Sequence, residues 1–409
     1  MERRTFIKNT LALAAVDTLF SGLNSRAEEL PAAASTAPAD KTRKIKTGFV
    51  GGGGRGAWIA NLFKEHSGYE AVAVADYFQP VADKLGDLLG VASDKRFSGL
   101  SGFKKVIESG IEAIVLEDVP YFFPEQAVAA VEAGLHVYIA KPVAVDVPGT
   151  LAVGEAGKSA TQKSRVFLVD YQIPTDPFNI EVAQRIQSGG LGKLAQIQTH
   201  GISGGFSDPP LTDTIESRLR GLIWVNDIAL GCDNIGNFDI HAIDAAVWVL
   251  KQRPISATGA SRSCRKDPHG DGRDTISLVF EYADGVIHNH YGQALRNTSE
   301  STLSAQFSGS EAIAQISYNG KAFVRGGSKH YGGGTVANLY KAGTERNIAL
   351  FYNNILQAKY ENESVVRAVD GTLACILGRE AAIKGQKLTM AELLKENRKL
   401  EVNLKGLKA

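Results

Sequence analysis

The chain has 409 residues, and its 45 basic and 44 acidic side chains give a formal net charge of +1. This length exceeds one ordinary hydrophobic core, so we expect two domains of about 120 and 240 residues. The charge balance argues against nucleic-acid binding, and three cysteines cannot form a fully paired disulfide framework. A single bridge between Cys232 and Cys264 stays open.

Residues 1–27 have the pattern of a twin-arginine export signal. Arg3 and Arg4 precede an apolar run over residues 11–23, and small residues follow where a signal peptidase would cut. The alternative is an N-terminal helix that starts with two arginines, which Asp17 within the apolar run mildly favours. Export would make the twin-arginine machinery a partner and place the protein in the periplasm or another extracytoplasmic space.

Residues 28–44 are mostly small, polar or charged and are expected to be a linker. No later stretch is long and apolar enough to predict a membrane span after processing.

The next segment has the order strand, glycines, helix. Lys46–Val50 is a short apolar strand, and residues 57–63 have helical periodicity. The glycines between them fit the G-x-G-x-x-G turn, whose backbone approaches a pyrophosphate at a helix N-terminus. A flexible glycine loop would have the same letters, so the flanking strand and helix carry the prediction. We expect the cofactor to contact Gly51, Gly53, Gly54, Arg55 and Gly56.

A second strand, Ala71–Ala75, ends in Asp76, about 20 residues after the last glycine, where an acid binds the adenosine ribose hydroxyls. A carboxylate would repel a 2′-phosphate, and the following Tyr77 and Phe78 bring no cation. The sequence therefore favours NAD over NADP. Asp76 could also cap the next helix, and the two roles are compatible.

The alternation continues through a strand at 113–116, a helix at 125–133 and a strand at 135–139. Such βαβ units predict a doubly wound parallel sheet, here a Rossmann domain over residues 45–165. Ligands bind beyond the carboxyl ends of its strands, where Asp118 and Lys141 are found.

Residues 166–409 are expected to form an α+β domain for substrate binding and oligomerisation. After a helix at 178–188, apolar and polar residues alternate in most of the following strands, which predicts a large, mostly antiparallel open sheet. The expected strands are 194–200, 255–261, 275–282, 286–292, 302–307 and 312–318. The fold class is therefore α/β with a second α+β domain.

A sugar-like ligand needs polar groups beside an apolar surface, and Tyr171, Gln172, Trp224 and Tyr291 are the candidates. The composition of residues 202–221 predicts a loop near the pocket. His288 and His290 would share one strand face without a third ligand, so no metal is predicted.

Several motifs, in chain order, resemble the glucose–fructose oxidoreductase, inositol dehydrogenase and rhizopine-catabolism family (Gfo/Idh/MocA). They are the glycine turn with Asp76, Ala133–Val137, Lys141-Pro142, Asp170-Tyr171-Gln172, Gly189–Lys193, and His241–Asp244 before Val247-Trp248. The resemblance covers nearly all of the chain from Lys46 onward.

The resemblance implies an NAD-dependent oxidoreductase that acts on a sugar, glycoside or cyclitol and assembles as a dimer or tetramer. Lys141 would lie beside the nicotinamide and touch the reacting hydroxyl. Asn237 and His241 occupy the family's acid and histidine positions, and a histidine is well matched to accept the hydroxyl proton. With Asp244 three residues further on, all three are expected to lie on one helical face, and Asp244 could fix the tautomer of His241.

Four positions depart from the family pattern. Ala140 replaces a glutamate before Lys-Pro, Asn237 replaces the acid, Phe123 replaces a histidine, and Asp118-Val119 replaces Thr-Pro. Cofactor binding is expected to survive these changes. They leave two alternatives: a glycosidase that recycles a tightly bound NAD without net redox change, and a homologue that binds nucleotide or sugar without turnover.

Overall fold

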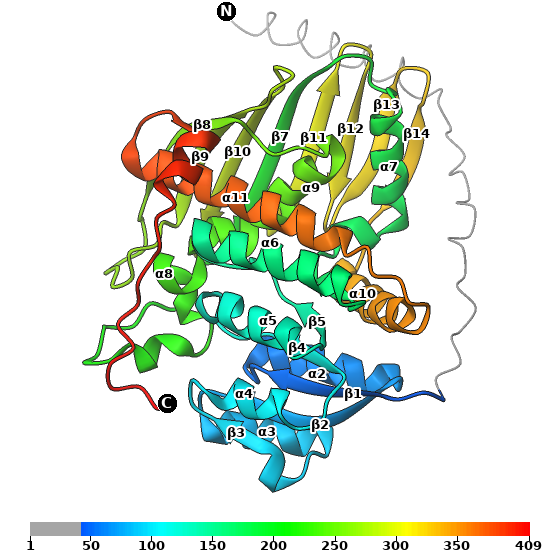
Figure 1. Ribbon diagram of the computed structural model, residues 1–409. Helices are drawn as coiled ribbons and strands as arrows, with labels where there is room; N and C mark the ends of the chain where they lie inside the picture. Colours follow the sequence, from blue (N-terminus) through cyan, green and yellow to red (C-terminus); the bar gives the residue numbers. More distant parts are fainter. Residues whose placement is uncertain (1–41) are drawn as a thin grey trace, which may run out of the picture.

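A computed structural model describes residues 42–409, so the predicted export signal and nearly all of the predicted linker lie outside the described residues. The described chain builds two sheets, each packed against helices (Figure 1). This arrangement confirms the predicted fold class.

The first sheet is parallel and has the strand order β3-β2-β1-β4-β5-β6. Two of its inner strands, β4 and β5, are buried along their whole length, as expected where helices cover both faces. The strands are β1 Ile45–Val50, β2 Tyr69–Asp76, β3 Arg96–Ser98, β4 Ala113–Leu116, β5 His136–Ile139 and β6 Phe167–Val169. The helices are α2 Gly54–His66, α3 Gln79–Leu89, α4 Gly102–Ile107, α5 Phe123–Glu132 and α6 Val147–Gln162.

The second sheet has nine strands in the order β14-β13-β12-β11-β7-β10-β9-β8-β15. The central β7 and β10 run parallel, and the other pairs are antiparallel. Its strands are β7 Leu194–Ser203, β8 Ser256–Arg262, β9 Thr275–Glu281, β10 Ile287–Ala294, β11 Thr302–Gly309, β12 Ala312–Ser317, β13 Lys321–Gly326, β14 Tyr331–Thr335 and β15 Leu388–Thr389. The six predicted strands are confirmed, and β13 to β15 were not predicted.

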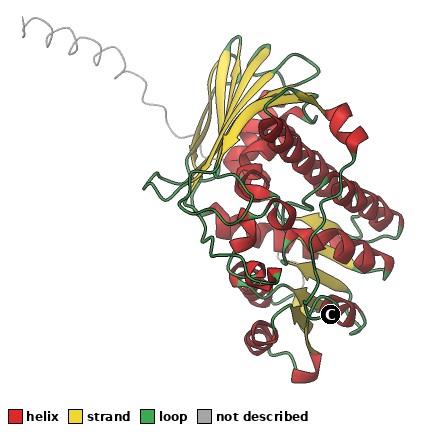
Figure 2. Cartoon of the chain, turned by 90° about the vertical axis from the view of Figure 1, so that its left-hand side faces the viewer, coloured by secondary structure: helices red, strands yellow, loops and turns green. Residues whose placement is uncertain are grey.

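Helices cover one face of this second sheet, and its other face carries no helix of the described chain (Figure 2). The covering helices include α7 Pro177–Gln187, α9 Ile240–Leu250 and α11 Glu363–Lys384. Smaller helices are α8 Ile228–Gly231 and α12 Met390–Glu396. Along β11 and β12 buried residues alternate with less buried ones. The alternation of apolar and polar residues in the sequence therefore reflects the packing of helices on one face of the sheet.

The C-terminal part of the chain returns to the first domain. Helix α10, Leu339–Leu356, packs against α2, and its residues Ile348 and Phe351 join the buried cluster of β1 and β2. Farther on, the backbone N–H of Leu100 donates to the carbonyl of Lys408 at 3.0 Å, where the chain end reaches the first sheet (Figure 1). Strand β6 belongs to the first sheet although it begins just after the predicted boundary at residue 165. Residues from both sides of that boundary therefore contribute to the first domain.

Within residues 42–409, no helix combines the length and apolar character that a membrane crossing requires.

Candidate functional site

A pocket of about 740 Å³ opens at the carboxyl ends of the first sheet's strands and is closed by residues of the second domain. Every cofactor residue predicted from the sequence lines it, from the glycine turn to Asp76, Asp118 and Lys141. Parallel strands bring these residues together because their carboxyl ends meet at one edge of the sheet.

The glycine turn fits a dinucleotide. Gly51 has φ +91°, and a Cβ on Gly56 would lie 2.0 Å from the carbonyl oxygen of Gly51, so helix α2 packs as closely as glycine allows. A Cβ on Gly53 or Gly54 would meet nothing within 4 Å, so open space lies beside the turn. No side chain caps the N-terminus of α2. Its N–H groups are therefore available to a pyrophosphate.

Two carboxylates face the part of the pocket beyond β2 and β4. Asp76 accepts hydrogen bonds from the N–H groups of Gly52 and Phe78, at 2.8 and 2.9 Å. Asp118 accepts from Val119 N–H, and burial, with the charge of Asp76, raises the pKa of Asp118 to about 6. Two acids at this end oppose a 2′-phosphate.

A segment of the second domain, residues 204–231, covers this end of the pocket, and we call it the cap. Phe206, Leu219 and Trp224 from the cap line the pocket, as expected for the predicted loop. Arg220 lies over the ring of Phe78, with its Cζ 4.2 Å from the ring centroid. Arg220 lies far from Phe78 along the chain, so no local pattern in the sequence indicates this cation.

Buried ion pairs hold the cap. Arg218, 1% exposed, pairs with Asp208 and Asp227, each at 2.8 Å. Arg265 pairs with Asp208 at 2.7 Å and ties the cap to the second sheet. Removing one partner would leave buried charge uncompensated, which is strongly destabilising.

Lys141 lines the pocket and donates a hydrogen bond to the backbone carbonyl of Asn237. Burial, and then the positive charge of Arg55, lower the pKa of Lys141 to about 7, against the opposing charges of Asp170 and Glu117. The amine is therefore partly neutral near pH 7.

Glu117 supplies an acid close to the position where Ala140 replaces the glutamate of the family pattern. Leu116 of β4 pairs with Ile139 of β5, so the next residues, Glu117 and Ala140, follow neighbouring strand ends, and both line the pocket. Burial raises the pKa of Glu117 to about 7, and Arg55 lies 3.5 Å away. Glu117 thus places a carboxyl near Lys141 that residue 140 does not supply.

His241 also lines the pocket and is 7% exposed. Burial, and then the charges of Lys141 and Arg55, hold the pKa of His241 well below its usual range, so the ring is neutral. Its Nδ1 has no hydrogen-bond partner among the described residues. An uncharged histidine with a free ring nitrogen is suited to accept a proton.

The structure corrects the expectation of one helical face through Asn237, His241 and Asp244. Ile235–Asp239 is a π-helical turn, and α9 starts only at Ile240. Asn237 and His241 both line the pocket, whereas Asp244 is fully buried and pairs with Arg367 at 3.1 Å. Asp244 therefore forms an ion pair with a residue of α11 and does not bond to the His241 ring.

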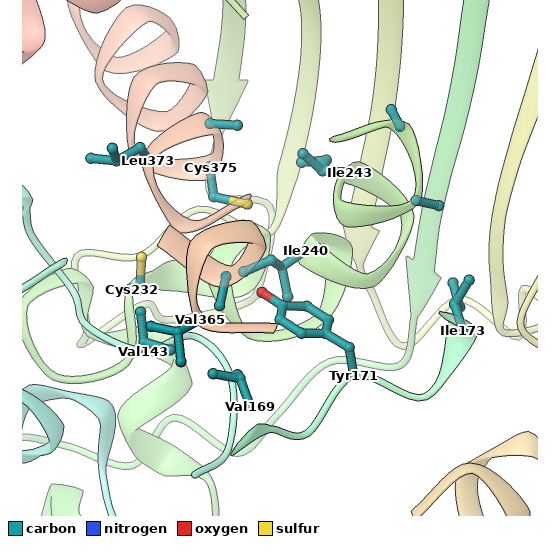
Figure 3. Close-up of a cluster of buried hydrophobic side chains, with 14 of the residues drawn as sticks. Val143, Val169, Tyr171, Ile173, Cys232, Ile240, Ile243, Val365, Leu373 and Cys375 are labelled. Carbon is teal, nitrogen blue, oxygen red and sulfur yellow. The ribbon is translucent and has the colours of Figure 1, made fainter. Parts of the chain in front are cut away.

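The four substrate candidates separate into two pairs. Gln172 and Trp224 line the pocket. Tyr171 is 2% exposed within the buried cluster that includes Ile240 (Figure 3), where it packs edge-on against His241. Tyr291 is 41% exposed, bonded to Gln293 on β10, and outside the pocket lining. Polar lining residues that the sequence did not single out are Ser301, Tyr318, Asn319, Asn338 and Tyr340.

All three cysteines are free in the described chain, so the bridge between Cys232 and Cys264 does not form. Cys232 is buried and Cys264 is exposed. Over residues 42–409, no three His, Cys, Asp or Glu side chains are grouped as metal ligands.

Part of the second domain is similar to a known family of domains. Residues 180–315 match the model of the GFO/IDH/MocA C-terminal domain. This stretch is about a third of the chain and lies within the second domain. An inositol 2-dehydrogenase of Saccharopolyspora erythraea is 27% identical over 250 residues, and a levoglucosan dehydrogenase of Pseudarthrobacter phenanthrenivorans is 22% identical over 261. These alignments cover 59% and 60% of this chain, but 65% and 66% of the relatives, slightly under two thirds of each.

Solved structures have the same fold over most of the chain. A levoglucosan dehydrogenase in complex with NADH and levoglucosan superposes with a TM-score of 0.69 at 15% identity, over 85% of this chain and 100% of the other. The aldose-aldose oxidoreductase of Caulobacter crescentus, complexed with glycerol, gives 0.66 at 16% identity over the same shares.

Proposed function

We propose that the protein is an NAD-dependent oxidoreductase of the Gfo/Idh/MocA family that acts on a CH–OH group of a sugar, glycoside or cyclitol. One observation carries the proposal: a glycine turn that fits a dinucleotide opens into the same pocket as Lys141 and His241. The named relatives support the substrate class, since they are inositol and levoglucosan dehydrogenases.

The residues that would hold NAD are Gly51 to Gly56 at the pyrophosphate and Asp76 with Asp118 at the adenosine ribose. The chemistry that NAD supplies when bound is acceptance of a hydride from the carbinol carbon. Arg220 over Phe78 adds a flat cation beside an aromatic ring at the adenosine end.

Lys141 and His241 would handle the proton of the reacting hydroxyl. As hydride leaves the carbon, that hydroxyl becomes acidic, and a base in hydrogen-bond reach lowers the barrier. Lys141 has a neutral fraction near pH 7, and His241 is neutral. Gln172, whose Oε1 accepts from the Tyr318 hydroxyl at 3.2 Å, would orient the substrate beside them.

The first test mixes the purified protein and NAD with a panel of sugars, cyclitols and aryl glycosides while the absorbance of reduced nicotinamide is followed. Net dehydrogenation gives reduced nicotinamide in proportion to substrate. A redox-cycling glycosidase releases aglycone without that accumulation, and a binding protein gives no product. Undiminished activity in both Lys141→Ala and His241→Ala would contradict the assignment of the pocket.

We further propose export by the twin-arginine route, because of Arg3, Arg4 and the apolar run that follows them. The measurement is the N-terminal sequence and cell fraction of the mature protein, with Arg3→Lys/Arg4→Lys as the comparison. Retention of the full-length wild type in the cytoplasm would reject this proposal.

We also propose a dimer or tetramer, since a second copy could cover the helix-free face of the second sheet. Light scattering of the purified protein tests it, and a monomer at micromolar concentration would count against it.

A further inference from the structure

A row of buried polar side chains runs from the second sheet to the π-helical turn behind the pocket. Asp239 Oδ2 lies 3.2 Å from His290 Nε2, and His290 Nδ1 lies 3.0 Å from Thr199 Oγ1. Thr199 Oγ1 lies 2.6 Å from His288 Nε2, and His288 Nδ1 lies 3.3 Å from the Tyr282 hydroxyl. None of the five is more than 2% exposed.

These contacts have one consistent direction of donation. Burial lowers the pKa of His288 to about 3, so its ring is neutral and has one donor and one acceptor nitrogen. Tyr282 then donates to His288, His288 to Thr199, Thr199 to His290, and His290 to Asp239. Every group in the row is satisfied, and the carboxylate is the final acceptor. A fully satisfied buried network fixes the positions of its members.

The carboxylate of Asp239 packs against the sheet at a place where two neighbouring glycines have no side chains. Gly201 of β7 and Gly292 of β10 are paired in register on the parallel strands at the sheet centre. A Cβ on Gly201 would lie 2.1 Å from Asp239 Oδ1, and one on Gly292 would lie 2.0 Å from Oδ2. Asn234 Nδ2 lies 3.2 Å from Oδ1. We call this arrangement the glycine socket.

The socket is joined to the reacting groups through the backbone. Asp239 is the last residue of the π-helical turn, which also contains Asn237. The carbonyl of Asn237 receives the Lys141 amine, and His241 follows Asp239 by two residues. Shifting Asp239 would therefore move the acceptor of Lys141 and the start of the helix that carries His241.

We propose that Asp239, held by His290 in the glycine socket, is the positioning residue for Lys141 and His241. This inference rests on the proposed function for its kinetic consequences, whereas its structural part does not. A π-helical turn beside a pocket is consistent with it, because such turns are frequent at functional sites.

The decisive variants are Gly201→Ala, which places a methyl group against the carboxylate, and Asp239→Asn, which keeps the shape and removes the charge. The matched control is Gly259→Ala on β8, where a Cβ would lie 2.2 Å from the Ser277 carbonyl oxygen, outside the pocket lining. Each protein is assayed below its unfolding temperature for kcat, KM, the dissociation constant of NADH, and amide hydrogen exchange over residues 235–250.

We expect Gly201→Ala to lower kcat by about 10- to 100-fold, the scale of a 1 Å misplacement, while NADH affinity changes by less than about twofold. Exchange over residues 235–250 should rise in Gly201→Ala and stay at the wild-type level in Gly259→Ala. Asp239→Asn should keep more activity than Asp239→Ala. A purely structural role predicts instead that Gly201→Ala and Gly259→Ala lower the unfolding temperature with kcat unchanged in both, and this result would overturn the proposal.

The exchange measurement separates the two proposals. If wild type oxidises no member of the substrate panel, the proposed function fails, and the socket is judged by hydrogen exchange alone. Raised exchange in Gly201→Ala but not in Gly259→Ala then supports the socket, and equal exchange in the two variants rejects it.

Discussion

Replacing Lys141 with methionine should stabilise the cofactor-free protein and remove its activity. Burial lowers the pKa of Lys141 from 10.5 to about 7, so the folded state disfavours the charged amine. A shift of this size corresponds to about 5 kcal/mol at about 1.4 kcal/mol per unit. Lys141 is partly exposed, so hydration reduces the cost, and we expect a gain of about 2–4 kcal/mol in the free energy of unfolding.

The stability gained in Lys141→Met should depend on pH. Between pH 7 and pH 10.5 the unfolded lysine keeps a proton that the folded one has lost, so wild-type stability from this group rises with pH. The advantage of Lys141→Met is therefore complete below pH 7 and declines toward zero as the pH approaches 10.5.

Urea unfolding of both proteins, without nucleotide, at pH 6.5 and pH 9.5 measures the effect. Lys141→Arg is the control, because it keeps a buried charge and should give no gain in stability. Equal stability of wild type and Lys141→Met at pH 6.5, or an advantage that does not shrink at pH 9.5, would refute the reasoning.

Four further outcomes are expected. Glu117→Gln removes a charge that raises the pKa of Lys141, so the ascending limb of kcat/KM against pH should move to lower pH, by about half a unit or more. An unmoved limb would show that the charge of Glu117 does not affect the titration of Lys141. Asp76→Ser should raise kcat/KM with NADP relative to NAD, by about tenfold, in steady-state assays. Arg218→Met leaves Asp227 without its cation, while Asp208 keeps Arg265, and should loosen the cap, raising the NADH dissociation rate in stopped-flow by about tenfold; an unchanged rate would mean that the cap does not retain the nucleotide. Thiol titration should find one accessible thiol, Cys264, in the folded protein and two more after unfolding.

The first domain was predictable because its signals are local. The strand, the glycine turn, the following helix and Asp76 lie within about 30 consecutive residues, and each has a short-range physical cause. The second sheet was predictable where apolar and polar residues alternate. Tyr331–Thr335 escaped because three glycines in five residues lack the side chains that favour a strand.

The missed parts of the site depend on residues that are distant in sequence. Arg220 meets Phe78 only after the second domain folds over the first. Glu117 compensates for Ala140 through the register of two parallel strands, which no single segment encodes. Asp244 was misplaced because the 3.6-residue period was applied across Asn237 and His241, where the backbone makes a π-helical turn.

The return of helix α10 to the first sheet determines when the chain can fold during its synthesis. Residues 45–169 supply all six strands of that sheet, yet part of its apolar surface is covered by side chains at 348–355. While only the first domain has left the ribosome, the apolar surface that α10 will cover is therefore still exposed. We expect the final structure to form only when most of the chain has left the ribosome, so that synthesis is nearly complete before the nucleotide pocket exists.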